Sequence, residues 1–240
     1  MRAEFSIGTV KSTDYGMVLT EIHTWDTPVA NVSFEPIAGR LDTLTVIDGR
    51  MENLDLSFVA WIGDEFKMRY TAFRNAVLSL KGYQRIFSST DLRCYRMGLV
   101  HQSVKGSPLV NGKSGYVEIH ITCKPQRFLL TGQDPVDLAA PGVITNPTAF
   151  PALPLIRVTG SGAGTLSVAG CTVELLAIDG HVWLDSETME AYRQDGSRAP
   201  ENKNGTVVAP EYPQLKPGGN QITWTGGVTA VEITPRWWEL

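Results

Sequence analysis

Polar and apolar residues alternate along much of the first half of the chain, and the period of the pattern changes. Leu54, Leu56 and Phe58 are separated by single polar residues, which is the period of a half-buried strand. Over about residues 64–81 the apolar positions instead recur every three or four residues and predict one helix. Strand alternation returns over 116–123. The apolar stripe of the predicted helix comprises Phe66, Tyr70, Phe73, Val77 and Leu80.

The flanking residues define the ends of this helix. Asp64 can act as the N-cap, and Lys81-Gly82 suits the C-terminal end, where a cation and a flexible residue are both favourable. We expect the apolar stripe to pack on the sheet of its own domain. Docking against a neighbouring subunit is the alternative interpretation.

The residues that precede position 53 predict short strands and turns. Trp25, Phe34 and Ile37 offer apolar anchors for the core of the first domain. Residues 38–40 are typical of a turn. The strand expected after this turn carries Leu44, Val46 and Ile47.

A change in composition separates the two halves of the chain. Five prolines lie between residues 128 and 154, and because proline stiffens the backbone and removes donors, this segment predicts a semi-rigid linker. Gly160–Gly164 is followed by strand alternation and no helix, so we interpret it as a β-turn and not as a phosphate loop. The short strands expected around such glycine-rich turns are Leu155–Thr159, Gly164–Val168, Cys171–Ile178 and His181–Asp185.

The last residues predict a terminal hairpin. Residues 222–224 and 231–233 form two strands, and the glycine pair at 226–227 suits a two-residue primed turn between them. Pro235 ends the ladder because it has no N–H to donate. Trp237 keeps the parity of the second strand and is therefore expected to face the core.

These patterns predict a mainly β chain with two sandwich-type domains. The N-terminal domain covers residues 1–133 and contains the single helix at about 64–81. A proline-rich linker covers residues 134–153, and the C-terminal β-sandwich domain covers residues 154–240.

Composition and charge narrow the function classes. A hydrophobic content of 42% and a charged content of 19% are typical of a globular protein, and neither a membrane span nor a secretory signal is visible. The first 130 residues hold 15 basic and 13 acidic side chains, net +2, and the rest hold 6 and 12, net −6. Neither half is basic enough to favour binding to phosphate backbones, so a nucleic-acid reader is not expected.

The sequence contains no group of residues whose spacing is typical of a catalytic or metal site. Asp185 and Glu187 share a strand face, but no groove signature accompanies them, and the favoured interpretation is an exposed strand end with Asp185 or Ser186 capping the turn that follows. The four histidines are scattered, and the three cysteines have no C-x-x-C spacing and are expected to be reduced, mostly buried thiols. We therefore expect a protein that is not an enzyme, with no catalytic, cofactor or metal site and no cofactor.

Several ordered segments together resemble a known family. The C-terminal run L-K-P-G-x-N-x-I-x-W-x-G-x-V-x-x-V-x-I-x-P-R-W follows I-D-G-H-V-W-L-D-S-E-T-M-E-A-Y at 178–192. Before them lie Y-G-x-x-L-T-E-I at 15–22, L-K-G at 80–82 and I-x-I-T-C-K-P-Q-R-F at 119–128. In this order and at these separations they resemble the distal tail proteins (Dit) of siphoviruses, phage tail family proteins.

That resemblance implies an architectural role. It implies a jelly-roll or galectin-like C-terminal sandwich and a ring-forming N-terminal domain. The expected assembly is a homohexameric ring, the baseplate hub, at the distal end of the virion's tail and assembled in the host cytoplasm. Its expected partners are the tail tube protein, the tail-associated (tail tip) protein and a receptor-binding protein. DNA would pass through the ring without sequence-specific binding, and no membrane partner is expected.

A phage-borne carbohydrate-binding module that recognises a host cell-wall glycan is the alternative function. Exposed aromatic side chains could stack on sugar rings, although core packing explains most of the tryptophans. Trp238 has the opposite parity to Trp237 and is the one candidate glycan contact. The other tryptophans considered are Trp61, Trp183 and Trp224.

Overall fold

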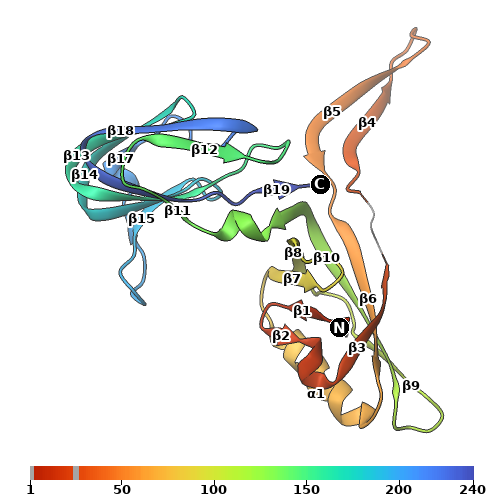
Figure 1. Ribbon diagram of the computed structural model, residues 1–240. Coiled ribbons are helices and arrows are strands. Elements are labelled where there is room, and N and C mark those ends of the chain that lie inside the picture. Colours follow the sequence, from red (N-terminus) through yellow and green to blue (C-terminus); the bar gives the residue numbers. More distant parts are fainter. Residues whose placement is uncertain (1–2, 24–26) are drawn as a thin grey trace. The chain divides into compact units, whose positions relative to one another are not determined.

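A computed structural model describes residues 3–23 and 27–240, and Trp25, one of the expected anchors, lies outside this range. The chain divides into two compact units (Figure 1). The first unit is Met1–Arg127 with Leu240, and the second is Phe128–Glu239. The division falls six residues before the boundary expected at residue 133. The two units are described separately below.

The main sheet of the first unit is antiparallel and has the strand order β2-β1-β7-β8-β10-β6-β3. A short strand, β9 (Lys105–Pro108), pairs with the beginning of β10. The bounds are β1 (Phe5–Ile7), β2 (Val10–Lys11), β3 (Met17–His23), β6 (Leu54–Ile62), β7 (Gln84–Ser88), β8 (Cys94–Leu99) and β10 (Gly115–Leu129), with a 3-10 turn at Ser12–Tyr15.

The helix α1 spans Phe66–Ser79, which confirms the helix predicted at about 64–81. Phe73 and Val77 of its apolar stripe are fully buried in the core of the first unit. Phe73 contacts Phe5 edge-on at 6.1 Å, and Phe5 stacks on Phe58 at 4.7 Å between ring centroids. The stripe therefore packs on the sheet of its own unit, as expected.

The predicted N-cap of α1 is wrong. The residue that precedes the helix is Glu65, which has a left-handed backbone (φ 55°) and no side-chain capping bond. Asp64 lies one residue further out, and its carboxylate accepts the Glu65 N–H at 2.9 Å. The Phe66 N–H, which a cap would otherwise satisfy, donates to the Lys113 carbonyl oxygen instead.

The main sheet of the second unit has the strand order β11-β18-β13-β14-β15-β16, with β12 also paired to β18 and β17 to β14. The bounds are β11 (Val136–Leu138), β12 (Gly142–Asn146), β13 (Leu155–Val168), β14 (Cys171–Asp185), β15 (Glu190–Arg193), β16 (Glu201–Asn202), β17 (Val207–Val208) and β18 (Gly218–Thr234). The short strand β19 (Trp238–Glu239) is not part of this sheet. Two 3-10 turns lie at Leu130–Gln133 and Asn204–Thr206.

The segment 134–153, expected as a linker, is part of the second unit's sheet. It contains β11 and β12, which pair with the two ends of β18. Its prolines lie outside these short strands, so they interrupt no ladder hydrogen bond. The expected boundaries of 134–153 and 154–240 thus divide a single folded unit.

The predicted terminal hairpin is wrong, and so is the predicted turn at Gly160–Gly164. β18 is one continuous strand through Gly226 and Gly227, and it runs antiparallel to β13, which is equally continuous through its own glycines. The register shifts where these glycines meet, as in a β-bulge. Glycine is required there because a Cβ on Gly227 would collide with the Ser161 carbonyl oxygen.

These bends allow one sheet to curl around one core. Side chains from both ends of β13, among them Val158 and Leu166, are fully buried in the same cluster as Val182 and Leu175 of β14. A β-sandwich therefore arises from long bent strands and not from many short ones. β18 ends at Thr234 before Pro235, and Trp237 is 6% exposed, which confirms both expectations for the C-terminal end.

Candidate functional site: an exposed arm and an aromatic pocket

The first candidate surface is a two-stranded arm, residues 30–51, formed by β4 (Ala30–Pro36), β5 (Thr43–Met51) and the turn between them (Figure 1). β4 pairs only with β5 among the described residues. Within the arm, Asn31 donates a side-chain hydrogen bond to Asp48 at 2.6 Å. The arm is thus a sheet of its own with two open edges.

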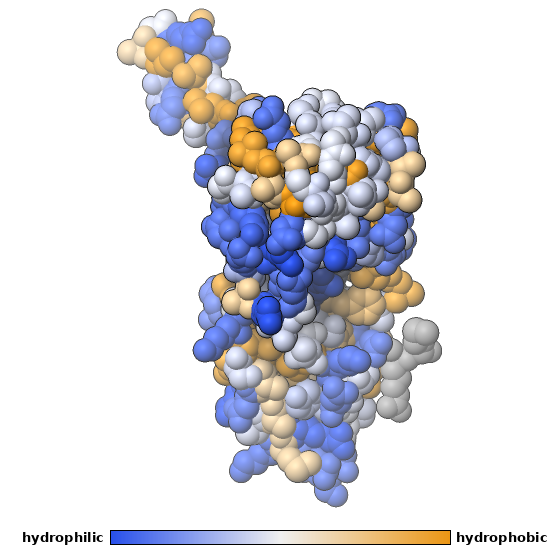
Figure 2. Space-filling model, turned by 90° about the vertical axis from the view of Figure 1, so that its left-hand side faces the viewer, coloured by the Kyte–Doolittle hydropathy of each residue, from blue (hydrophilic) through white to orange (hydrophobic). Residues whose placement is uncertain are grey.

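Apolar side chains cover both faces of the arm. Phe34 and Ile47, on one face, are 63% and 67% exposed, and Leu44 and Val46 lie on the other face at 44% and 45%. Figure 2 shows orange, hydrophobic residues among blue, polar ones on the hairpin that projects at the upper left of the view. Phe34 and Ile37 therefore do not anchor a core, which corrects the expectation from the sequence.

A two-stranded hairpin that packs against no other element has low stability in water. Isolated two-stranded hairpins are marginally stable, and open strand edges invite pairing with another chain. No arm residue belongs to the core cluster of the first unit. The arm is consequently a surface that gains stability when a partner covers it.

The sequence-predicted chemical groups do not come together. The described residues hold no group of three or more His, Cys, Asp or Glu side chains that could bind a metal ion. His120 contacts Glu118 at 2.8 Å, and His181 contacts the Gln194 carbonyl oxygen at 3.1 Å. The His23 side chain lies outside the described residues. No helix in the described part of the chain is long and apolar enough to cross a membrane.

Asp185 is a structural carboxylate and not an exposed strand end. It is buried, and the Arg236 guanidinium donates to both of its oxygens at 2.7 and 3.0 Å. The Glu187 N–H donates to it at 2.9 Å, so the turn is capped by Asp185, one of the two residues that the sequence offered for this cap. Burial opposes ionisation of Asp185, but the hydrogen bonds and charge of Arg236 outweigh it and lower the pKa of this carboxyl.

Trp238 is partly buried in the second unit. Its indole ring stacks on Phe150 with 4.6 Å between centroids, and its N–H donates to the Pro151 carbonyl oxygen at 2.9 Å. Trp238 thus holds the segment before β13 in place. A glycan contact through Trp238 stays a prediction. Of the other tryptophans, Trp224 packs against the core and Trp61 is 38% exposed.

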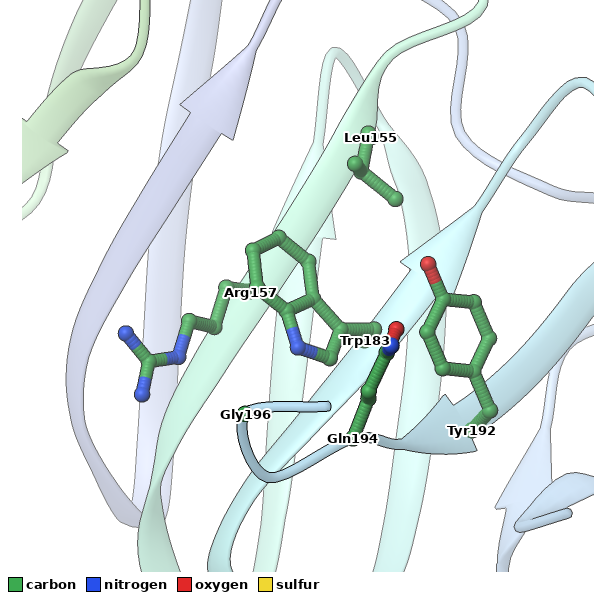
Figure 3. A pocket seen from close by; sticks show the side chains of 6 residues that line it. All are labelled: Leu155, Arg157, Trp183, Tyr192, Gln194 and Gly196. Carbon is green, nitrogen blue, oxygen red and sulfur yellow. The ribbon is translucent and has the colours of Figure 1, made fainter. Parts of the chain in front are cut away.

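The second candidate surface is a pocket of about 470 Å³ in the second unit, centred on Trp183 (Figure 3). Its lining comes from β13, β14, β15 and the residues that follow β15. The signal in the sequence was the aromatic pair in W-L-D and A-Y of segment 178–192, but only the strand register shows that these side chains are neighbours. The lining residues are Leu155, Arg157, Trp183, Tyr192, Gln194 and Gly196.

With this geometry, the chain has the two-unit fold of phage tail and baseplate proteins. A solved structure described as the SPP1 Dit (gp 19.1) protein, "a paradigm of hub adsorption apparatus in Gram-positive infecting phages", superposes with a TM-score of 0.73 at 13% identity and covers 100% of both chains. The phage P2 baseplate in its activated conformation gives TM-scores of 0.55 with Ca and 0.53 with Sr, at 9% and 10% identity. The P2 matches cover 97% and 96% of this chain and 97% of that chain in both cases.

No protein-family model and no curated protein sequence matches the chain. At these identities the likeness to the solved structures establishes the fold. It confirms the expected mainly β, two-unit architecture with one helix, and the resemblance read from the sequence segments.

Proposed function

We propose that this protein is a structural component of a phage tail: a distal tail protein, the baseplate hub. Six copies form a ring that joins the tail tube to the tail tip and to the receptor-binding apparatus. The ring is assembled in the host cytoplasm and remains in the virion. The protein acts by position and contact, and is not an enzyme.

The observation that carries this proposal is the full-length match to the SPP1 Dit fold. It spans both units and both chains completely, with a TM-score of 0.73. A match of one sandwich unit alone would have little functional weight, because β-sandwiches serve many functions. The P2 baseplate matches, which also span nearly the whole chain, support the same location.

The arm supports self-assembly as a second, independent feature. Its apolar faces and open edges need a covering partner, and a second copy of the chain offers one at every position of a closed ring. A head-to-tail contact between an arm and a different surface of the next copy closes on itself in a cyclic assembly. We therefore assign the arm to the contact between neighbouring copies.

Light scattering after size exclusion tests the ring. The expected species has six times the 26.3 kDa mass of the chain, or a multiple of that mass. A protein that stays monomeric at the highest soluble concentration would contradict assembly from free chains. Immunogold labelling of intact tails then tests the location: gold at the distal end supports the proposal, and gold along the tail tube opposes it.

A charged arm tests the contact. Phe34→Asp combined with Ile47→Asp is expected to shift the hexamer to monomers, because each carboxylate would be buried in the interface. Circular dichroism should be unchanged, since the arm lies outside the core. Leu176→Asp, at an exposed position of β14 in the second unit, is the matched control and should remain hexameric. A hexameric double variant would remove the arm from the ring contact.

A further inference from the structure

A row of large side chains lies on the outer face of the second unit's sheet, where they are not part of the hydrophobic core. The register aligns Arg157 of β13 with Trp183 of β14, and Trp183 with Tyr192 of β15. Their strand neighbours Ile156 and Leu184 point the opposite way and are fully buried in the core. The row is therefore on the outer side of the sheet, and its aromatic rings are only partly buried.

The row forms one side of the pocket. In Figure 3 the Trp183 indole lies between the Arg157 side chain and the Tyr192 ring, with Gln194 beside it. The volume of about 470 Å³ is within the roughly 300–1,000 Å³ range of small-molecule sites. Leu155 adds an apolar contact, and Gly196 contributes backbone without a side chain. The Trp183 indole, with the Arg157 guanidinium over its ring at 5.6 Å from the centroid, thus lines a hollow of suitable size.

Polar groups without protein partners surround this ring surface. Within the described residues, neither the Tyr192 hydroxyl nor the Trp183 N–H nor the Gln194 amide makes a side-chain hydrogen bond to protein. The Nε atom of Arg157 is buried without a partner, and its nearest carboxylate, on Glu232, is 3.9 Å from Nη1. The hydroxyl of Tyr192, the N–H of Trp183 and the amide of Gln194 are therefore available to a ligand that both donates and accepts hydrogen bonds.

The charged side chains around the pocket are engaged with one another, and the carboxylates outnumber the guanidinium groups by one. Arg157 faces Glu232, and the neighbouring Arg193 contacts Asp179 at 2.6 Å and Asp195 at 3.1 Å. Each arginine already faces a carboxylate, so the site offers little attraction to an anion, and the excess carboxylate, Asp179, is 85% exposed and screened by solvent. The ligand that matches is uncharged, has many hydroxyl groups and presents an apolar ring face.

We propose that this pocket binds a neutral hexopyranose residue of a glycan. One face of the pyranose ring, which exposes C–H groups, stacks on Trp183. Its hydroxyl groups exchange hydrogen bonds with Tyr192 and Gln194. The binding site is contained in one copy of the second unit, so it neither requires nor tests the ring proposed above.

Saturation-transfer difference NMR on the full-length protein tests the site. The probes are methyl α-D-glucopyranoside, methyl β-D-galactopyranoside and methyl N-acetyl-β-D-glucosaminide. Transfer to the ring protons of at least one glycoside is expected, with Kd on the order of 1 mM, as for one sugar in an open pocket. Absence of transfer to all three would overturn the proposal.

Variants locate the binding. Trp183→Ala is expected to raise Kd at least tenfold, and Leu176→Ala, an exposed apolar residue of the same strand outside the pocket, should leave Kd unchanged within twofold. Tyr192→Phe and Gln194→Ala each remove a single polar group from the pocket. They provide a second test of the site if the Trp183→Ala variant does not fold. Each should raise Kd about threefold or more. Unchanged binding in both, or an equal loss in Leu176→Ala, would refute the assignment.

Discussion

Replacement of Arg236 with alanine tests the ion pair with Asp185. The arginine donates to both carboxylate oxygens, and the two side chains are only 19% and 12% exposed. Without it, the buried Asp185 carboxylate keeps only backbone N–H donors from the turn that follows, such as that of Glu187. The lost partner therefore leaves a largely buried charge uncompensated.

The magnitude follows from this burial. Loss of one partner of a fully buried pair costs about 3–5 kcal/mol, and the residual exposure places Arg236→Ala near the lower end, about 3 kcal/mol. For a chain of this length each kcal/mol lowers Tm by about 3 °C, which gives a decrease of about 10 °C. The left-handed backbone of residue 236 (φ 58°) does not contribute to this difference, because arginine and alanine are equally strained there.

The pH dependence separates the ion pair from packing. Because the pKa of Asp185 is lowered in the fold, its contribution is fully present above the carboxyl's unfolded value, near 3.8, and is lost as pH falls through the lower folded value. The difference between wild type and Arg236→Ala should thus be constant from about pH 5 to 8. It should narrow below that carboxyl's ordinary pKa.

Urea unfolding monitored by circular dichroism at several pH values measures both effects. Arg157→Ala is the matched control: this arginine lies on the same sheet, but it is 39% exposed and reaches Glu232 only at 3.9 Å, so the expected loss is below about 1 kcal/mol. A loss below 1 kcal/mol for Arg236→Ala would refute the reasoning on burial. A difference that persists unchanged at pH 3 would refute the electrostatic reasoning.

Three further predictions concern the core, the bends and the thiols. Phe73→Ala should lower the unfolding free energy by about 3–5 kcal/mol in urea, and a loss below 1 kcal/mol would contradict its place in the core. Gly227→Ala should cost more than 1 kcal/mol, because its Cβ meets the Ser161 carbonyl oxygen; an unchanged Tm would contradict the tight bend. Burial raises the pKa of Cys123 to about 12, so a thiol reagent at pH 8 should modify the partly exposed Cys171 first and Cys123 only in urea, and the reverse order would contradict this.

Regular patterns in the sequence predicted the elements that form by themselves. The three- and four-residue spacing around Phe73 identified α1, because a helix buries one stripe wherever it packs. The parity of Trp237 correctly placed it in the core. Both inferences need only the local backbone period and no knowledge of which strands are neighbours.

The glycines of β13 and β18 led to the two wrong turn predictions. Glycine pairs are typical of hairpin turns, but in β13 and β18 they mark positions where two backbones approach too closely for a Cβ. Which of these two roles a glycine has depends on the strand opposite, and a sequence does not display that strand. The prolines of 134–153 misled similarly, because short strands between prolines can still pair with β18.

The two candidate surfaces share the same reason for being invisible in the sequence. Phe34 and Ile47 of the arm are of residue types that usually form protein cores. Only the absence of a further strand or helix over them in the described structure shows that they face solvent. Trp183 and Tyr192 are likewise aromatic residues of the kind that often lies in a core, and the strand register alone places them beside each other on the outer face. Hydrophobicity predicts that a side chain will be covered. Whether its own chain, a second copy or a sugar covers it depends on the tertiary structure, and the experiments on the arm and on the pocket test this separately in each unit.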